Sequence, residues 1–176
     1  EMERVLLKNQ EMQIKNYINA VIKLGAMDYW EAQPFLEGFT EEEKLFLYGA
    51  AGGNPHYMSY LDAELSFKDN LKKLFFEPAA PLYKEPIQLL KLYLREPATY
   101  NTILCSVACG AGRLNEIAAA ADMECNKVSK YLNVLLTMGI LQRVNPAFSS
   151  SNKISYYEIA NNMFVFWYQF VFPYMS

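Results

Sequence analysis

Few residues of this chain have the types and spacing that catalysis requires. His56 is the sole histidine, and without evident partners it cannot form a serine–histidine–aspartate triad, so we interpret it as a helix residue near a turn. Cys105, Cys109 and Cys125 could be considered as metal ligands, but the sequence offers no fourth ligand nearby. We therefore interpret the cysteines as small buried residues and expect no metal site.

The sequence also lacks the loops that bind nucleotide phosphates. It contains no G-x-x-x-x-G-K-[ST] motif and no G-x-G-x-x-G motif after a strand. Gly110-Ala111-Gly112 fits neither pattern and is interpreted as a turn between helices. Paired carboxylates in a pocket context are also not evident. We expect that this chain alone neither binds ATP tightly nor hydrolyses it.

Composition favours a globular protein. Hydrophobic residues make up 52% of the chain and charged residues 20%, with a net charge of −3, which matches a nucleic-acid-binding protein poorly. The odd number of cysteines argues against a disulfide framework and favours a reducing compartment. No secretory signal is visible, and the longest apolar run, 163–173, is too short to span a bilayer. We expect a soluble cytoplasmic protein with no membrane partner.

The clearest pattern is a helix-turn-helix between Arg113 and Arg143. Its apolar residues recur at helical spacing: Leu114, Ile117 and Ala118 in the first helix, and Val128, Leu132, Leu135 and Leu136 in the second. Gly139 is a typical left-handed stop, and residues 140–144 and 156–159 alternate like two paired strands. The sequence predicts a mainly α fold containing a winged helix-turn-helix domain with a small two-stranded wing, over 82–160.

Polar side chains on the second helix are candidates for contacts with DNA. They lie near its N-terminal half, which is where such helices enter the major groove. The candidate DNA-binding residues are Asn126, Lys127, Ser129, Lys130 and Arg143. Four carboxylates nearby nearly cancel this charge: Glu116, Asp122, Glu124 and Glu158. We expect weak, salt-sensitive duplex binding at best, and a solvated face used for protein contacts is the alternative.

The N-terminal half has strong local signals for helix ends. Thr40 and Glu43 have the spacing of a capping box. In Gly52-Gly53-Asn54-Pro55, the glycines permit left-handed backbone and Pro55 suits the first position of a new helix. Residues 77–81 are the best candidate for a linker.

Taken in order, these segments resemble the C-terminal half of the archaeal-type predicted ATPases of the AAA+/STAND class. The resemblance covers about 28–173 and rests on these motifs: Gly52–Tyr57, Leu94–Pro97 with Tyr100 and Ile103–Leu104, Arg113–Ala118, Val128–Leu132, Gly139–Ile140 and Asn162–Pro173. It implies a helical lid over 28–81, before the winged helix. It also implies that a P-loop domain, which binds ATP and Mg, precedes this region, and that a nuclease-like domain often follows.

The resemblance gives the glycine turn a role. Gly52 and Gly53 would let the backbone approach the nucleotide, and Pro55 would pack near the adenine, so that the lid senses ATP. The structural alternative is a plain turn between helices. Residues 1–24 fit the family poorly, and 1–27 are assigned to an uncertain segment, interpreted as the end of the ATPase domain. On this interpretation the chain is a fragment that is inactive without its P-loop domain.

The C-terminal segment, 161–176, is predicted to be a helix with aromatic residues on both faces. We expect Trp167 and Val171 to pack on the winged helix. Phe166 and Phe170 are expected to meet a partner, either the downstream domain or a second chain in a homo-oligomer. The leading hypothesis is a nucleotide-sensing lid with a winged-helix effector region. The alternatives are a free-standing DNA-binding transcriptional regulator and a protein-interaction module.

Overall fold

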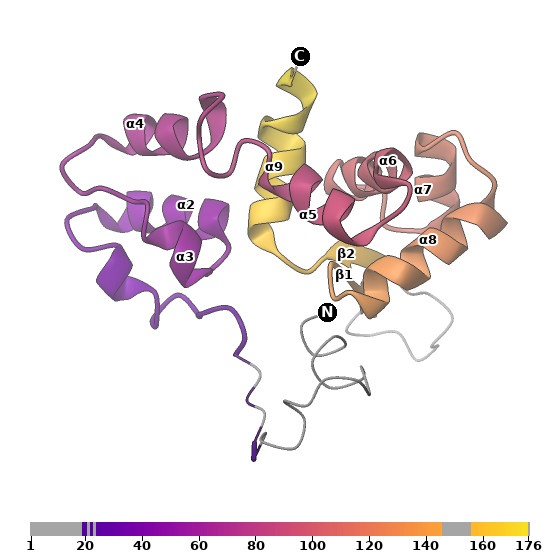
Figure 1. The fold of residues 1–176 in the computed structure, drawn as a ribbon, viewed down its shortest axis with the longest axis horizontal. Coiled ribbons are helices and arrows are strands. Elements are labelled where there is room, and N and C mark those ends of the chain that lie inside the picture. Colours follow the sequence, from indigo (N-terminus) through magenta and orange to yellow (C-terminus); the bar gives the residue numbers. More distant parts are fainter. Residues whose placement is uncertain (1–18, 21, 23, 146–155, 176) are drawn as a thin grey trace.

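The computed structural model describes residues 19, 20, 22, 24–145 and 156–175. Within these residues the chain is mainly helical with a two-stranded antiparallel sheet, which confirms the predicted fold class. Figure 1 shows the helices of 28–81 on one side of the C-terminal helix and those of 82–137 on the other. Residues 1–18 of the uncertain segment, and residues 146–155 between the two predicted strands of the wing, lie outside the described residues.

Three α-helices, a 3₁₀ turn and a π-helical turn make up residues 28–81, which we call the lid. They are the 3₁₀ turn Gln33–Phe35, α2 (Glu41–Ala51), α3 (Pro55–Met58), α4 (Phe67–Leu71) and the π-helical turn Lys72–Phe76. Thr40 begins α2 with the predicted capping box: its hydroxyl accepts from the backbone N–H of Glu43, and its own N–H donates to the Glu43 carboxylate. These backbone and side-chain bonds lower the pKa of Glu43.

The π-helical turn was not predicted from the sequence. It is closed by the N–H of Glu77, which donates to the carbonyl of Lys72, five residues earlier. Phe75 is fully buried, whereas the next residue, Phe76, is 43% exposed. The turn therefore ends the lid with two adjacent aromatic rings, one inside the core and one at the surface.

The second half of the chain forms the winged helix. Its elements are α5 (Glu85–Tyr93), α6 (Pro97–Ala108), α7 (Leu114–Ala120), α8 (Cys125–Thr137), β1 (Leu141–Val144) and β2 (Tyr156–Ile159). Gly139 has the expected left-handed backbone, with φ of +72°. In the sheet, Leu141 pairs with Ile159 and Val144 with Tyr156. The N–H of Tyr157 also donates to the carbonyl of Gly112, so β2 holds the turn before α7.

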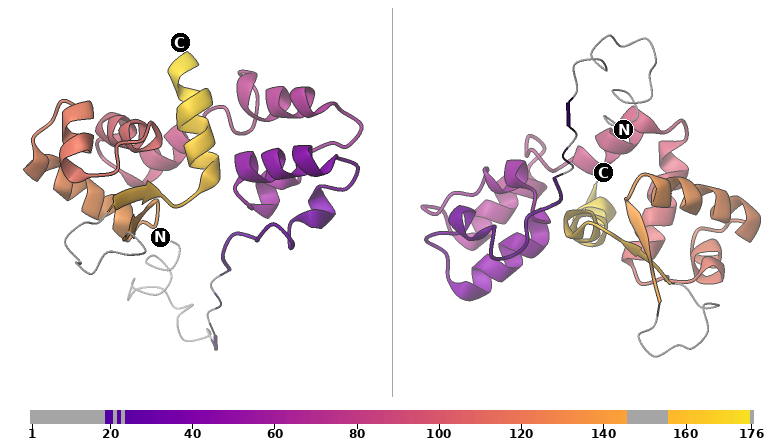
Figure 2. Two further views of the ribbon diagram at one scale, coloured as in Figure 1. Left: turned by 180° about the vertical axis from the view of Figure 1, so that it is seen from behind. Right: turned by 90° about the horizontal axis from the view of Figure 1, so that it is seen from below.

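The C-terminal helix α9 (Asn162–Phe170) stands between the two halves, as the views in Figure 2 show from behind and from below. It packs against both α2 and α6. The indole nitrogen of Trp167 donates to the carbonyl of Tyr83, and the hydroxyl of Tyr168 donates to Oδ1 of Asn101 in α6. Trp167, Tyr168 and Val171 are buried, so the predicted core face is confirmed.

The second face of α9 differs from the sequence prediction. The Phe166 ring lies 4.8 Å from the Phe75 ring and 6.5 Å from the Phe76 ring, measured between centroids. The lid of the same chain therefore covers much of Phe166, which needs no second chain for this. Phe170, one turn later, remains 50% exposed. Sequence patterning could not identify the lid as the neighbour, because the contact joins segments about ninety residues apart.

A short 3₁₀ turn, Phe172–Tyr174, follows α9. Among the residues that the structure describes, no helix has the length and apolar composition needed to cross a bilayer.

Candidate functional site

The glycine turn at the end of α2 is the first candidate site. Gly52 and Gly53 both have left-handed backbone, with φ of +70° and +67°. The N–H of Gly52 donates to the carbonyl of Tyr48 and thereby closes α2. Asn54 then begins α3, because its side-chain oxygen accepts from the N–H of His56, 2.9 Å away. Pro55 occupies the first helical position, as predicted.

Both glycines lie close to other parts of the same chain. A Cβ on Gly52 would be 2.5 Å from Oδ1 of Asn161 and 3.0 Å from the backbone nitrogen of Met163. A Cβ on Gly53 would be 2.3 Å from the carbonyl oxygen of Met27. The close approach that these glycines permit is therefore to the N-terminus of α9 and to the segment around Met27. Nucleotide contact through their Cα atoms would have to displace these neighbours.

Hydrogen bonds hold the Met27 segment against the turn. The N–H of Met27 donates to the carbonyl of Gly53 at 2.9 Å, and the hydroxyl of Tyr48 donates to the carbonyl of Met27 at 3.0 Å. Asn161 caps α9, since its Oδ1 accepts from the N–H of Met163 at 2.8 Å. The turn thus joins three segments: the Met27 segment just before the lid, the end of α2 and the first turn of α9.

Pro55 differs from the glycines because it is exposed. Its neighbour His56 is also exposed, and the imidazole Nε2 lies 3.3 Å from the hydroxyl of Tyr60. These side chains offer an accessible ring surface at the start of α3. Of the three predicted nucleotide-contacting residues, Pro55 is therefore the one whose side chain is free to meet a ligand.

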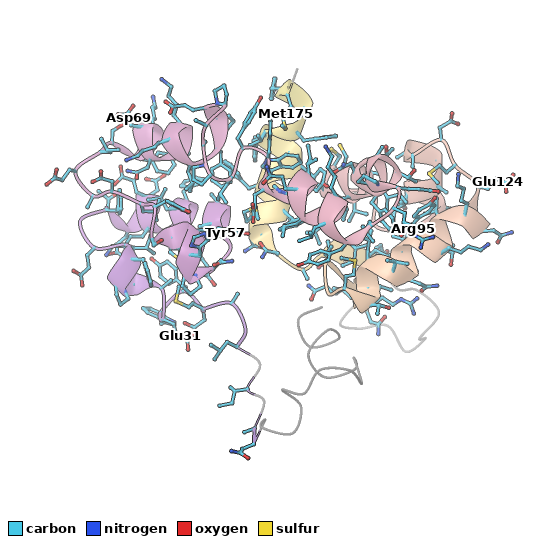
Figure 3. The ribbon with its side chains drawn as sticks, viewed as in Figure 1. Glu31, Tyr57, Asp69, Arg95, Glu124 and Met175 are labelled. Carbon is cyan, nitrogen blue, oxygen red and sulfur yellow. The ribbon has the colours of Figure 1, made fainter. Side chains whose placement is uncertain are left out.

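Tyr57 links the same short helix to the winged helix. Its hydroxyl donates to Oε1 of Glu85, the first residue of α5, at 3.1 Å. Burial of the phenol, reinforced by the Glu85 charge, raises the pKa of Tyr57 well above its usual value. Figure 3 labels Tyr57 on the side of the lid that faces α9. At α3, Pro55 is therefore exposed to solvent, whereas Tyr57 is hydrogen bonded to the second half of the chain.

The lid also has an open hollow of about 600 Å³ beyond the end of α3. Ser59, Tyr60, Asp62 and Lys73 contribute polar atoms to it, and the Lys73 ammonium lies 3.9 Å from the Asp62 carboxylate. Neither glycine nor Pro55 lines this hollow. The structure therefore does not bring the predicted nucleotide contacts together with it.

The outer face of α8 is the second candidate site. Val128, Leu132 and Leu135 point into the core and are fully buried. The predicted DNA-binding residues lie on the opposite side: Asn126, Lys127 and Lys130 are exposed and Ser129 is half-buried. Arg143 is exposed on β1. The helix thus presents the expected residues outward, although nothing in the fold itself requires a nucleic-acid partner.

Two arginine–tyrosine stacks on β2 were missed from the sequence. The Arg143 guanidinium lies 5.5 Å from the Tyr157 ring centroid, and that of Arg113 lies 5.0 Å from the Tyr156 ring centroid. Arg113 also donates to the hydroxyl of Tyr156. Each pair places a guanidinium against an aromatic ring of β2. The adjacent tyrosines of β2 are visible in the sequence, but which arginine contacts each tyrosine depends on the fold.

Charge is distributed unevenly between the two halves. Residues 28–81 contain four lysines and ten carboxylates, whereas 82–160 contain eight lysines and arginines and six carboxylates. Glu116 is already engaged, since its carboxylate accepts from the N–H groups of Gly112 and Arg113. Glu124, labelled in Figure 3, precedes α8 at the end of the molecule far from the lid. The excess of positive charge therefore lies on the winged helix and the excess of negative charge on the lid.

The cysteines are all free thiols. Cys105 lies on the last turn of α6 and is half-buried, whereas Cys109, the residue that follows the helix, is exposed. The interpretation of every cysteine as a buried residue is therefore wrong for Cys109. Burial and the neighbouring Cys109 raise the pKa of the Cys105 thiol. Among the described residues there is no group of three or more metal-ligating side chains.

Comparison with known proteins found one relative of similar sequence. The chain is 29% identical, over 157 residues, to an uncharacterized protein of Methanocaldococcus jannaschii. The match covers 89% of this chain but 35% of the relative, so the chain spans about a third of that protein's length. No protein-family model and no solved structure matches the chain.

Proposed function

We propose that this chain is the nucleotide-sensing lid and winged-helix effector region of a P-loop ATPase of the AAA+/STAND type. The observation that supports this most strongly is the contact between the glycine turn and α9. A side chain on Gly52 would collide with Asn161, the cap of the helix that packs between the lid and the winged helix. A change at the turn therefore has a direct physical route to the second half of the chain.

The coupling begins at α3. Nucleotide bound against Pro55 would shift α3, whose Tyr57 is hydrogen bonded to Glu85 of α5. It would also shift the turn that contacts Asn161 at the start of α9. Because α9 is packed on α6 through Tyr168 and Asn101, both routes end in the winged helix. Two short routes from one turn are what a sensor needs in order to transmit a small movement.

ATP and Mg would be held mainly by the P-loop domain, which supplies the phosphate-binding loop and its lysine. In this proposal Pro55 provides a contact to the base. Gly52 and Gly53 support that contact by allowing the turn to fit against Met27 and Asn161. They would not touch the nucleotide through their Cα atoms, which is a change from the role that the family resemblance implied.

The partners in this proposal are the P-loop domain of the same protein and a nuclease-like domain after α9. The length of the archaeal relative supports the idea of further domains, since most of it lies outside the matched region. We place the protein in the cytoplasm, where three free cysteines are stable.

The proposal is tested by nucleotide titration of the complete gene product with Pro55→Ala. Pro55 is exposed at the first helical position, where the N–H that alanine introduces needs no partner within the helix, so alanine there should leave the fold intact. We expect ATP affinity to fall by about fivefold or more, which corresponds to roughly 1 kcal/mol. Leu92→Ala, at an exposed position of α5, is the matched control. If ATP affinity is unchanged in both variants, the turn has only a structural role and the proposal is wrong.

A second candidate function is DNA binding by the winged helix. It is favoured by one observation, the exposure of Asn126, Lys127 and Lys130 beside Arg143. The same residues could belong to an effector region that contacts protein, so the DNA role is subordinate to the lid proposal.

A further inference from the structure

Two thiols lie one helical turn apart at the end of α6, and the proposed function uses neither of them. Cys105 is on the last turn of the helix, and Cys109 is the residue at which the helix stops. The N–H of Cys109 donates to the carbonyl of Cys105 at 2.9 Å, so the backbone between them keeps its helical form. Because residues four apart in a helix lie on the same face, the two side chains are neighbours.

The two thiols interact with each other, and one of them is accessible. Burial, followed by the charge and a hydrogen bond of the Cys109 thiol, raises the pKa of the Cys105 thiol. Cys109 is exposed, whereas Cys105 is half-buried. The third cysteine, Cys125, is engaged elsewhere, because its Sγ donates to Oδ1 of Asn115 at 3.4 Å. Cys105 and Cys109 therefore form a separate pair.

The chain next to Cys109 is open. Gly110 follows it with left-handed backbone, at a φ of +107°. No atom lies within 4 Å of the position that a Cβ on Gly110 would occupy, so a small reagent has room beside the exposed thiol. Glycine also accepts a change of its backbone angles, which allows Cys109 to move relative to the helix.

The pair suits sulfur chemistry better than metal binding. A structural zinc ion takes four ligands, and the part of the chain that the structure describes has no group of three or more metal-ligating side chains. Two adjacent thiols are, however, sufficient for a disulfide, which needs no further ligand.

The separation of the two cysteines allows a disulfide only if the end of the helix tightens. The Cβ atoms of residues four apart in a helix are about 5–6 Å from each other. A disulfide requires about 3.5–4.5 Å between Cβ atoms, so the bond would form with strain. Strained or exposed disulfides are easily reduced, and in a reducing compartment they are usually transient and redox-sensing or catalytic.

We propose that Cys109 reacts with small-molecule disulfides and that Cys105 converts the product into a reversible Cys105–Cys109 disulfide. The Cys109 thiolate attacks one sulfur of the small disulfide, and the other sulfur leaves as a thiolate. Cys105 then attacks the Cys109 sulfur, and the second small thiolate leaves. The two leaving thiolates take up the two protons that the protein thiols release. The protein pair is thereby oxidised, and the small disulfide is reduced to two thiols.

The difference between the two thiols sets the order of these steps. Cys105 is shielded, and its raised pKa keeps it protonated at neutral pH, so it reacts slowly with a reagent from solution. Once Cys109 is bonded to the small thiol, its sulfur carries no charge. The part of the Cys105 pKa shift that comes from that charge is then removed, which favours the second step.

The bond would act on the contact between α6 and α9. The carbonyl of Ala108, between the two cysteines, accepts from Nε2 of Gln169 in α9 at 2.6 Å. Tightening the turn between Cys105 and Cys109 therefore strains a hydrogen bond to the helix that packs between the two halves of the chain. This inference goes beyond the proposed function, and it holds whether or not the glycine turn senses nucleotide.

Mass spectrometry of the 176-residue chain after incubation with glutathione disulfide tests the proposal. Residues 96–112 contain no lysine or arginine, so trypsin releases both thiols in one peptide, 96–113, and Cys125 in the next. We expect peptide 96–113 to lose two hydrogen atoms, and dithiothreitol to restore them. The Cys125→Ser variant should give the same product and is the matched control.

Two further variants separate the steps. In Cys105→Ser, the mixed disulfide with glutathione should accumulate on Cys109 in place of the internal bond. In Cys109→Ser, the reaction of peptide 96–113 should slow about tenfold or more, because the remaining thiol is shielded. A mixed disulfide that persists in the original chain would contradict the role of Cys105. Lack of reaction at peptide 96–113 would overturn the whole proposal.

Hydrogen exchange tests the effect of the bond on the fold. The N–H groups of Cys109, Gly110 and Ala111 donate to carbonyls of the last turn of α6 and close the helix. In the oxidised chain their exchange should be faster by about threefold or more. The N–H of Leu94, which closes α5, should exchange at its original rate. If the three amides at the end of α6 are unchanged, the bond does not tighten the helix end and that part of the proposal is wrong.

Discussion

The position that a side chain on Gly52 would occupy lies 2.5 Å from Oδ1 of Asn161, more than a hundred residues later in the chain. Asn161 is at the same time the cap of α9, through its bond from the N–H of Met163. The end of a lid helix and the beginning of the central helix therefore form one joint. This joint, rather than the glycines alone, is the feature on which the proposed coupling depends.

Gly52→Ala should destabilise the chain by about 2–3 kcal/mol. Left-handed backbone costs a non-glycine residue about 1–2 kcal/mol, and the displaced Asn161 cap adds about 1 kcal/mol. Gly49→Ala is the matched control, because its helical backbone and open surroundings accept a methyl group and should stabilise the chain by up to about 1 kcal/mol. Urea denaturation of both variants measures the change in the free energy of unfolding. Equal changes for Gly52→Ala and Gly49→Ala would contradict the contact between Gly52 and Asn161.

Trp167→Ala should cost about 3–5 kcal/mol, because the indole is fully buried between the two halves of the chain. Its hydrogen bond to the carbonyl of Tyr83 is lost as well. Phe170→Ala, at a half-exposed position three residues later, should cost much less. Thermal unfolding compares the two, and an unshifted midpoint for Trp167→Ala would remove that residue from the core.

Tyr168 gives the fold a dependence on alkaline pH. Burial, reinforced by the neighbouring Cys105, raises the pKa of its phenol. Above about pH 10 the unfolded chain releases this proton before the folded chain does, so the free energy of unfolding falls as pH rises. The fall is at most about 1.4 kcal/mol per pH unit for one such group.

Tyr168→Phe should make the alkaline loss of stability less steep. At neutral pH it should cost about 1–2 kcal/mol, because Oδ1 of buried Asn101 loses its donor. Tyr174→Phe is the control, since Tyr174 is 81% exposed. Urea titrations from pH 7 to about pH 11 provide the measurement. If the free energy of unfolding of Tyr168→Phe falls with pH as steeply as that of the original chain, the Tyr168 phenol is not the source of the alkaline loss of stability.

The winged helix should bind duplex DNA weakly and without sequence preference. Lys127→Ala and Lys130→Ala should each weaken binding and lower the salt slope by about 0.9, the value for one phosphate contact. Lys91→Ala, at an exposed position of α5, should have little effect. Anisotropy titrations at several salt concentrations measure both quantities. Tight, sequence-selective binding at physiological salt would favour the regulator hypothesis instead.

Local features of the fold could be predicted from the sequence, because short-range signals determine them. The capping box at Thr40, the first helical position of Pro55 and the left-handed Gly139 depend on neighbouring residues, and all three are confirmed. The caps also fix the helix starts to within one or two residues.

Long-range features could not be predicted in the same way. The contact of Phe166 with Phe75 and the stack of Arg113 on Tyr156 join distant segments, whose relative positions depend on the whole fold. The role of Gly52 was anticipated only in part: its backbone conformation was correct, but its neighbour is Asn161. Sequence patterning identified the turn without identifying what it touches.

Hydrogen exchange in the complete gene product, with and without ATP and Mg, tests the central proposal most directly. The N–H groups of Met27, Gly52 and Met163 report on the Met27 segment, the end of α2 and the first turn of α9, through their bonds to Gly53, Tyr48 and Asn161. We expect ATP to slow their exchange about tenfold or more, which corresponds to about 1.4 kcal/mol. Absence of ATP binding, or binding that leaves exchange at these three amides unchanged, would contradict the lid proposal.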